Sequence, residues 1–237
     1  MLAFLFGVVS LLYATVGQAG GTAFLALMAF ASFPPSEMRP TALLLNIVAA
    51  TYSTWLFNRG NLVDWEKLRP LLIASLPTAL LGGLIVLDVS LYNAITGVVL
   101  LVAAAIPLLR RHDSSFDQVT PRWAAIAVGG GVGLVSGLTG VGGGVFLAPL
   151  LIAFRWASPK QTSALSAPFI LANSVVGLAG ATYAGQTPSH DTWLYAAAAL
   201  AGAMIGAVVG LKWLSHTTTR YVLAAILGSA GIHLLVF

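Results

Sequence analysis

Two glycine-rich runs are the parts of the chain best suited to binding a ligand, and both lie inside long apolar stretches. They cover residues 17–22 and 139–144. Glycine has no Cβ and tolerates positive φ, so each run predicts a break in a helix. A helix that starts again after such a break presents unpaired backbone N–H groups and roughly half a positive charge. Each run therefore predicts a helix N-terminus that a small anion can approach closely.

Polar side chains in and after the two runs would complete such a site. Gln18, Thr22 and Thr139 lie in the runs themselves. The amides Asn46 and Asn173 lie in later apolar stretches, where they need partners, and the alternative to a binding role is a hydrogen bond to a neighbouring helix. The predicted substrate-binding residues are Gly17, Gln18, Ala19, Gly20, Gly21, Thr22, Thr139, Gly140, Val141, Gly142, Gly143, Gly144, Asn46, Thr51, Ser163, Ser166 and Asn173.

Catalytic and metal-binding chemistry is not indicated. The sequence has no cysteine and no cluster of His, Asp or Glu at ligand spacing. The spacing Gly129-x-Gly131-x-Gly133 resembles a nucleotide loop but lacks the preceding strand and the following acidic residue. The Lys and Arg residues are scattered through short loops without a basic face, which excludes nucleic acid as a partner. We therefore expect no enzyme, no catalytic residue, no cofactor and no metal site.

The composition indicates a membrane protein. Of the 237 residues, 58% are hydrophobic and 8% are charged, whereas soluble domains carry about 25% charged residues. So few charges cannot cover a surface that faces water, so the outer surface must face lipid. No removable signal peptide is evident at the N-terminus.

Six stretches are long enough to cross a hydrocarbon core about 30 Å thick. They are residues 40–57, 70–87, 91–109, 162–183, 192–213 and 218–237. Two further apolar regions, 2–33 and 123–154, contain the glycine runs, and the pieces on either side of each run are short for a span. Each of these two regions is either a broken spanning helix or a re-entrant hairpin.

The distribution of positive charge favours re-entrant hairpins, because cytoplasmic loops carry an excess of Lys and Arg. If both broken regions return to the side from which they came, ten of the eleven Lys and Arg residues lie on one side and Arg39 lies alone on the other. If both regions cross, the division is six against five. The ten residues are Arg59, Lys67, Arg69, Arg110, Arg111, Arg122, Arg155, Lys160, Lys212 and Arg220.

An internal duplication organises the chain. Residues 20–26 align with residues 142–148, Ser36 aligns with Ser158 and Thr41 with Ser163, all at one offset (142 − 20 = 122). Three crossings per half is an odd number, so the second half starts on the opposite face. We therefore expect an all-α integral membrane protein with an inverted-topology repeat, each half a re-entrant or broken helical hairpin plus three transmembrane helices. The halves are residues 1–110 and 122–237, and residues 111–121 form a cytoplasmic linker.

The second glycine run and its surroundings carry a resemblance to a known family. The sequence Gly137-Leu138-Thr139-Gly140-Val141-Gly142-Gly143-Gly144, then Phe146-Leu147-Ala148-Pro149 and residues 159–165, resembles the sulfite exporter TauE/SafE family of membrane permeases. The first copy departs from this pattern, because Gln18 and Ala19 replace glycine-rich positions and Thr22 stands opposite Gly144. The resemblance implies transport of sulfite, a sulfonate or another small organic anion, and leaves its direction open.

These observations predict a transporter for a small anion bound at the membrane midplane by the hairpin helix N-termini. A passive anion channel of the same architecture is the alternative. The expected location is a bacterial inner (plasma) membrane, multi-pass in the lipid bilayer, with both termini extracytoplasmic. Arg39 is a gating candidate at the outer mouth, and the alternative is an ordinary loop arginine near Glu37. The small-residue stripe Gly202-x-x-x-Gly206-x-x-x-Gly210 predicts a helix contact, within one subunit or in a homodimer.

Overall fold

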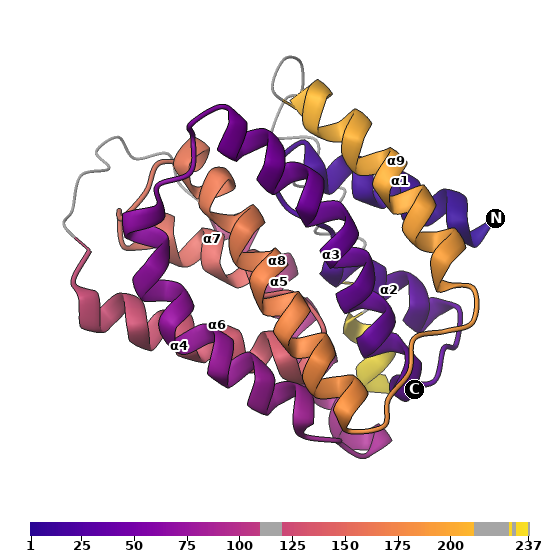
Figure 1. Ribbon diagram of the computed structural model, residues 1–237. Coiled ribbons are helices and arrows are strands. Elements are labelled where there is room, and N and C mark those ends of the chain that lie inside the picture. Colours follow the sequence, from indigo (N-terminus) through magenta and orange to yellow (C-terminus); the bar gives the residue numbers. More distant parts are fainter. Residues whose placement is uncertain (110–119, 211–227, 229–230, 237) are drawn as a thin grey trace.

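The computed structural model describes residues 1–109, 120–210, 228 and 231–236 (Figure 1). Regular structure in these residues is helical, and they contain no strand. The helices are α1 (Leu2–Ala14), α2 (Gly21–Phe30), α3 (Pro35–Arg59), α4 (Trp65–Leu84), α5 (Val89–Leu109), α6 (Arg122–Thr139), α7 (Gly144–Ala153), α8 (Pro159–Tyr183) and α9 (Thr192–Gly210). The prediction of an all-α protein is confirmed.

Three of these helices have a segment long and apolar enough to cross a membrane: Pro35–Arg59, Lys160–Tyr183 and Thr192–Val209. They coincide with three of the six predicted spans. Two further predicted spans, 70–87 and 91–109, coincide with α4 and α5 to within a few residues. The last predicted span, 218–237, lies mainly outside the described residues. The chain is therefore an all-α membrane protein.

The start of α3 differs from the prediction, which placed the beginning of the span at Pro40. The helix begins at Pro35 and contains Pro40 within its second turn. Proline suits the first helical position because the N–H group there has no intrahelical acceptor. Arg39 consequently lies inside a helix, so the alternative of an ordinary loop arginine is wrong.

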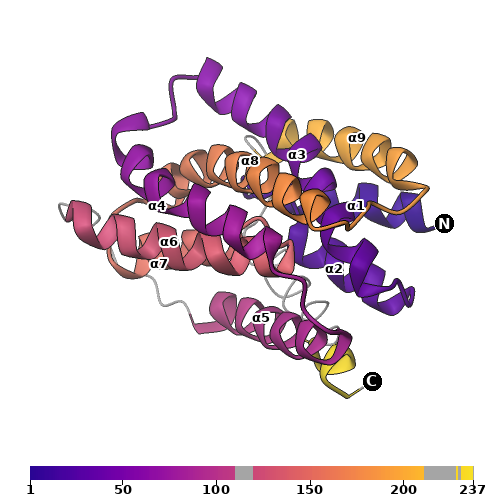
Figure 2. The same cartoon turned by 60° about the horizontal axis from the view of Figure 1, so that its bottom comes forward.

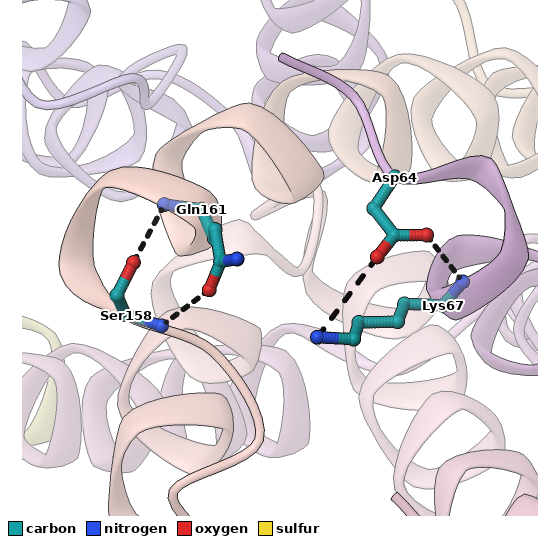
Figure 3. A network of polar contacts seen from close by, with 4 residues as sticks. All are labelled: Asp64, Lys67, Ser158 and Gln161. Carbon is teal, nitrogen blue, oxygen red and sulfur yellow. Dashed lines mark hydrogen bonds and ion pairs between the residues drawn. The ribbon is translucent and has the colours of Figure 1, made fainter. Parts of the chain in front are cut away.

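Side-chain caps define where α4 and α8 begin (Figure 3). The Asp64 carboxylate accepts a hydrogen bond from the Lys67 backbone N–H at 3.1 Å, and its second oxygen lies 3.9 Å from the Lys67 ammonium. At α8 the Ser158 hydroxyl accepts from the Gln161 N–H at 3.3 Å, and the Gln161 side chain accepts from the Ser158 N–H at 3.0 Å. This reciprocal capping box satisfies two donors that a helix start otherwise leaves unpaired.

Stripes of glycine bring pairs of helices into close contact. On α6, a Cβ added to Gly133 or Gly137 would overlap the backbone carbonyl oxygen of Ser75 or Ala79 on α4. The sequence Gly129-x-Gly131-x-Gly133 is thus part of a helix, and Gly129 packs on α4 in the same way. On α9, a Cβ on Gly202 or Gly206 would overlap carbonyl oxygens of α1, so the predicted contact of this stripe is intramolecular at these two positions.

The helix pairs surround a central pair. α3 and α8 pack against each other in the middle, α1 and α9 pack together beside α3, and α4 and α6 pack together beside α8 (Figure 1). The short helices α2 and α7 contact α3 and α8 respectively. α5 lies to one side of this group, next to the described residues 231–236 (Figure 2). In this arrangement the interruption between α1 and α2 and the one between α6 and α7 both lie beside the central pair, α3 and α8.

Candidate binding site between the helix breaks

Both glycine runs break the helical path, as predicted. α1 ends at Ala14 and α2 begins at Gly21, and α6 ends at Thr139 and α7 begins at Gly144. The glycines at the breaks have positive φ, which a residue with a Cβ adopts only with strain. The φ angles are 74° at Gly17, 109° at Gly20, 86° at Gly140, 83° at Gly142 and 80° at Gly143.

The two breaks, more than 100 positions apart in sequence, meet in space. A Cβ added to Gly21, at the start of α2, would overlap the backbone carbonyl oxygen of Val141 in the second break. A Cβ added to Gly144, at the start of α7, would lie 2.6 Å from Oε1 of Gln18 in the first break. The N-termini of α2 and α7 therefore share one buried region.

Backbone carbonyl groups at the end of α6 are occupied by side-chain donors. Asn46 Nδ2 donates to the carbonyl oxygens of Gly140 and Val141, each at 3.2 Å. The Tyr92 hydroxyl donates to the carbonyl oxygen of Thr139 at 3.0 Å, and the Thr139 hydroxyl donates to its own helix at 2.7 Å. Asn46 thus has a clear local role, since its amide holds the second break from the middle of α3.

The first break is held in a related way from α8. The Ser163 hydroxyl donates to the carbonyl oxygen of Val16 at 2.8 Å. The Thr15 hydroxyl donates to the carbonyl oxygen of Leu12 at 2.6 Å. Each long central helix therefore binds the break of the opposite half of the chain: α3 binds the second break and α8 binds the first.

The backbone N–H groups at the starts of α2 and α7 have no hydrogen-bond partner in the described part of the chain. The glycine N-caps of α2 and α7 have no side chain with which to cap. Among the described residues no acceptor bonds to the N–H groups of Gly21, Thr22, Gly144 and Val145. Gly21, Thr22 and Gly144 are buried and Val145 is half-buried. Free donors enclosed in this way leave room for an acceptor supplied by a ligand.

Several buried side-chain oxygens near the breaks also lack a partner among the described residues. Two of them, in Ser136 of α6 and Ser174 of α8, were not among the predicted site residues. A Cβ added to Gly142 would lie 3.1 Å from the Ser174 hydroxyl oxygen, and one added to Gly143 would lie 3.4 Å from the Ser136 Cβ. The unpartnered oxygens beside the break glycines are Gln18 Oε1, Asn46 Oδ1, Ser136 Oγ and Ser174 Oγ, and Ser166 Oγ and Asn173 Oδ1 elsewhere on α8 are likewise buried without a partner in the described structure.

A pattern in the sequence could predict Ser174 as a site residue. Ser166, Ile170 and Ser174 recur at four-residue spacing and so share one face of α8. Ile170 packs against Gly142 and Gly144, which shows that this face turns toward the second break. Ser136 lies one helical turn before Gly140, a position that follows from the break only once α6 is known to be helical up to Thr139.

Other predicted residues lie away from the free donors or are already occupied. Thr51 is exposed on α3 and donates to its own helix at 2.6 Å. Asn173 turns toward α4, where Nδ2 donates to the Ser75 hydroxyl at 3.2 Å. The Thr22 hydroxyl is 2.8 Å from the Tyr13 hydroxyl. The structure therefore brings Gln18, Asn46, Ser163 and the glycines to the breaks, and it does not bring Thr51 there.

Arg39 is buried to 1% exposure, and its guanidinium caps helix ends. Most of its acceptors are carbonyl groups at the end of α4, where the helix dipole is negative. The side chain also reaches α6 and the loop that precedes α9. The contacts are to the carbonyl oxygens of Gly82 at 3.2 Å, Gly83 at 2.9 Å, Ile85 at 2.8 Å and Leu138 at 3.5 Å, and to Gln186 Oε1 at 2.7 Å.

The charge balance near the breaks is positive. Among the described residues, Arg39 is the one buried charged side chain, and none of their Asp or Glu side chains is buried. A Cβ added to Gly140 would lie 3.2 Å from the Arg39 Cγ, so the aliphatic stem of Arg39 adjoins the second break, while its guanidinium bonds carbonyl groups at the end of α4. Two helix N-termini without a buried carboxylate among the described residues make the region favourable for an anion.

A cavity elsewhere in the fold does not compete with this site. It has a volume of about 260 Å³ between α5, α6 and α7 and is lined by apolar side chains such as Val98, Val132 and Phe146. An ion in such a cavity would have no hydrogen-bonding partner and would be costly to desolvate. We therefore place the candidate site at the breaks.

An all-α membrane protein with two interrupted helices meeting at its centre has the architecture of a polytopic membrane transporter. A family comparison agrees: the model for "Sulfite exporter TauE/SafE" matches residues 2–234. The chain belongs to the sulfite exporter TauE/SafE family of membrane transporters.

Two relatives support the same class. The chain is 37% identical over 240 residues to "Probable membrane transporter protein y4hK" of Sinorhizobium fredii, covering 99% of this chain and 97% of the relative. It is 26% identical over 202 residues to "Probable membrane transporter protein YunE" of Bacillus subtilis, covering 76% and 72% of the two chains. No solved structure matches the chain. Family and relatives alike indicate a transporter and not an enzyme.

Proposed function

We propose that this transporter is a carrier for a small anion, such as sulfite, a sulfonate or another organic anion. The anion binds between the N-termini of α2 and α7, near the middle of the membrane. The bacterial origin of both relatives supports a bacterial plasma membrane as its location.

The observation that carries the proposal is the set of free backbone donors at the starts of the two interrupted helices, α2 and α7. Carbonyl groups at the ends of α1 and α6 are bonded by Ser163, Asn46 and Tyr92. The N–H groups that open α2 and α7 are left free. Free N–H groups and the positive end of the helix dipole favour an anion over a cation at such a position. Backbone donors also avoid a permanent cation at the bilayer centre, which costs at least about 2.5–3.5 kcal/mol.

We further propose that α1–α2 and α6–α7 are re-entrant hairpins from opposite faces of an inverted repeat. α2 leads through Phe33 into the start of α3. The residues after α7 lie at the other end of α3, because Trp156 belongs to the apolar cluster of Leu68 and Val63. α3 has 25 residues, so the two hairpins open toward ends of the bundle about 37 Å apart at 1.5 Å per residue.

Burial of the site favours a carrier over a channel. The starts of α2 and α7 are enclosed by side chains of both halves, including Gln18, Asn46 and Ile170. Release of an enclosed anion to either side requires movement of one part of the bundle against another, as in alternating access. A channel would instead show currents far above the turnover of a carrier.

Gly144→Ala in proteoliposomes tests this function, with Gly131→Ala as the matched control. A Cβ at Gly144 would meet the flexible ends of Ile170 and Gln18 and would fill the space in front of the free N–H groups. A Cβ at Gly131, in α6, meets nothing within 4 Å. Wild type and Gly131→Ala should carry sulfite or a small sulfonate, whereas Gly144→Ala should raise the half-saturating concentration at least about tenfold, equivalent to about 1.4 kcal/mol.

Two results would count against the proposal. One is the absence of flux for every small anion tested with the wild-type protein. The other is unchanged flux and half-saturation in Gly144→Ala, because the anion could then not lie against the start of α7.

A further inference from the structure

We propose that Gln18 is a tethered competitor of the transported anion: its side-chain oxygen occupies the N-terminus of α7 when the site is empty, and an oxyanion must displace it to bind. This inference rests on the proposed function and deepens it. It assigns the α7 terminus as the principal anion position and makes Gln18 the residue that sets the affinity of that position.

Gln18 reaches from one half of the chain to the other. The residue lies in the first break, between α1 and α2. Its Oε1 lies 2.6 Å from the position of a Cβ on Gly144, the first residue of α7. The side chain therefore stands where a ligand approaching the start of α7 would have to lie.

The oxygen of Gln18 is buried without a hydrogen bond. The residue is 9% exposed, and Oε1 has no donor among the described residues. A buried acceptor without a partner is costly, and the partial positive charge of a helix N-terminus compensates part of that cost. An amide oxygen carries only a partial negative charge, so an oxyanion should hold the same position more strongly.

The surroundings of this position suit an oxyanion. The free N–H groups of Gly144 and Val145 and the unpartnered hydroxyls of Ser136 and Ser174 are all potential donors near the start of α7. At the start of α2 the side-chain hydroxyl of Thr22 is already hydrogen bonded to Tyr13. Asn46, whose Oδ1 lies 2.9 Å from the Cβ position of Gly21, is held by its own bonds to the second break. The second break thus adds unpartnered hydroxyl groups to its free N–H groups, and Gln18 Oε1 is the polar side-chain atom nearest the Cβ position of Gly144.

Competition by Gln18 predicts the direction in which its removal changes the apparent affinity for the anion. If Gln18 occupies the site in most of the empty molecules, the apparent dissociation constant is the intrinsic one divided by the open fraction. Gln18→Ala should therefore lower the half-saturating anion concentration, by about 5–10-fold if the open fraction is about 0.1–0.2. Removal of a residue that simply binds the substrate would instead raise the half-saturating anion concentration.

Gln18→Glu gives the complementary test. A carboxylate at the same position would satisfy the free N–H groups of α7 and would be held by the helix dipole. The variant should unfold a few °C higher than wild type in detergent, since N-cap bonds stabilise helices and small gains shift the midpoint by about 2–4 °C per kcal/mol. It should also lose the stabilisation by added sulfite and lose sulfite flux.

Gln161→Glu is the matched control. It makes the same chemical change at the exposed start of α8, where glutamate preserves the capping box with Ser158. Its flux and its stabilisation by sulfite should equal those of wild type.

The experiment compares wild type and the three variants by sulfite and sulfonate flux in proteoliposomes and by thermal unfolding with and without sulfite. A higher half-saturating concentration in Gln18→Ala, or normal flux in Gln18→Glu, overturns the competitor role while leaving the proposed function intact. Loss of the folded state in Gln18→Glu also overturns it, because the role predicts added stability. If wild type carries no anion at all, the proposed function itself fails.

Discussion

Replacing Ser174 with alanine should stabilise the protein or leave its stability unchanged, while weakening anion binding. The Ser174 hydroxyl is fully buried and has no partner among the described residues. An unsatisfied buried hydroxyl costs about 1–3 kcal/mol, and the change removes a single atom. We expect the free energy of unfolding of Ser174→Ala to rise by up to about 1 kcal/mol, because the small void offsets part of the gain.

The affinity of Ser174→Ala for the anion should fall. A hydrogen bond to a charged group contributes about 1.5–3 kcal/mol, so losing one should raise the apparent dissociation constant of the anion about 10–100-fold. Sulfite flux in proteoliposomes over a range of concentrations measures this change. Thermal unfolding in detergent, without and with sulfite, measures stability and ligand binding in the same sample.

Ser163→Ala is the control, since the Ser163 hydroxyl donates to the carbonyl oxygen of Val16 at 2.8 Å. Its removal should destabilise the protein by about 1 kcal/mol, the usual net value of such a bond. If Ser174→Ala loses stability as Ser163→Ala does and keeps normal half-saturation, the Ser174 hydroxyl is structural, and the assignment of spare donors to the second break is wrong.

Three further predictions concern the frame around the site. Arg39→Lys keeps the charge but loses the planar fork that bonds several carbonyl groups, so it should lower the free energy of unfolding by at least about 2 kcal/mol in denaturant or thermal titrations; an unchanged midpoint would show that those bonds contribute little. Gly133→Ala would press a methyl group against the Ser75 carbonyl oxygen and should cost about 1–3 kcal/mol or more, with normal thermal unfolding as the contrary result. Single cysteines at the exposed positions Ser36 and Lys160, in a chain without native cysteine, should react with an impermeant thiol reagent from outside and inside respectively; labelling from one side only would refute the inverted repeat.

The helix breaks could be predicted from the sequence because glycine acts locally. Residues 17–22 and 139–144 combine several glycines in a short run, and no neighbouring segment is needed to make that run interrupt a helix. The stripe of Gly202 and Gly206 was recognised for a similar reason, since small residues at four-residue spacing permit close helix contact wherever the partner comes from.

Contacts between distant segments could not be predicted in the same way. A span predicted to start at Pro40 leaves Arg39 outside it, and no residue near Arg39 in the sequence indicates that carbonyl groups of α4 accept hydrogen bonds from its guanidinium. Ser136 and Ser174 are ordinary residues in apolar helices until the second break is known to lie between them. The sequence alone does not distinguish Thr51 from Asn46, because both are polar residues in one apolar stretch. The orientation of α3 about its axis exposes Thr51 and buries Asn46.

The most direct test of the central claim is a structure of the wild-type protein in lipid nanodiscs with sulfite bound. We predict density for the anion within about 3 Å of the backbone nitrogens of Gly144 and Val145, the range of N–H···O hydrogen bonds, with the Gln18 side chain displaced from the start of α7. Anion density remote from both breaks, or density with Gln18 still at the start of α7, would contradict recognition by the interrupted helices.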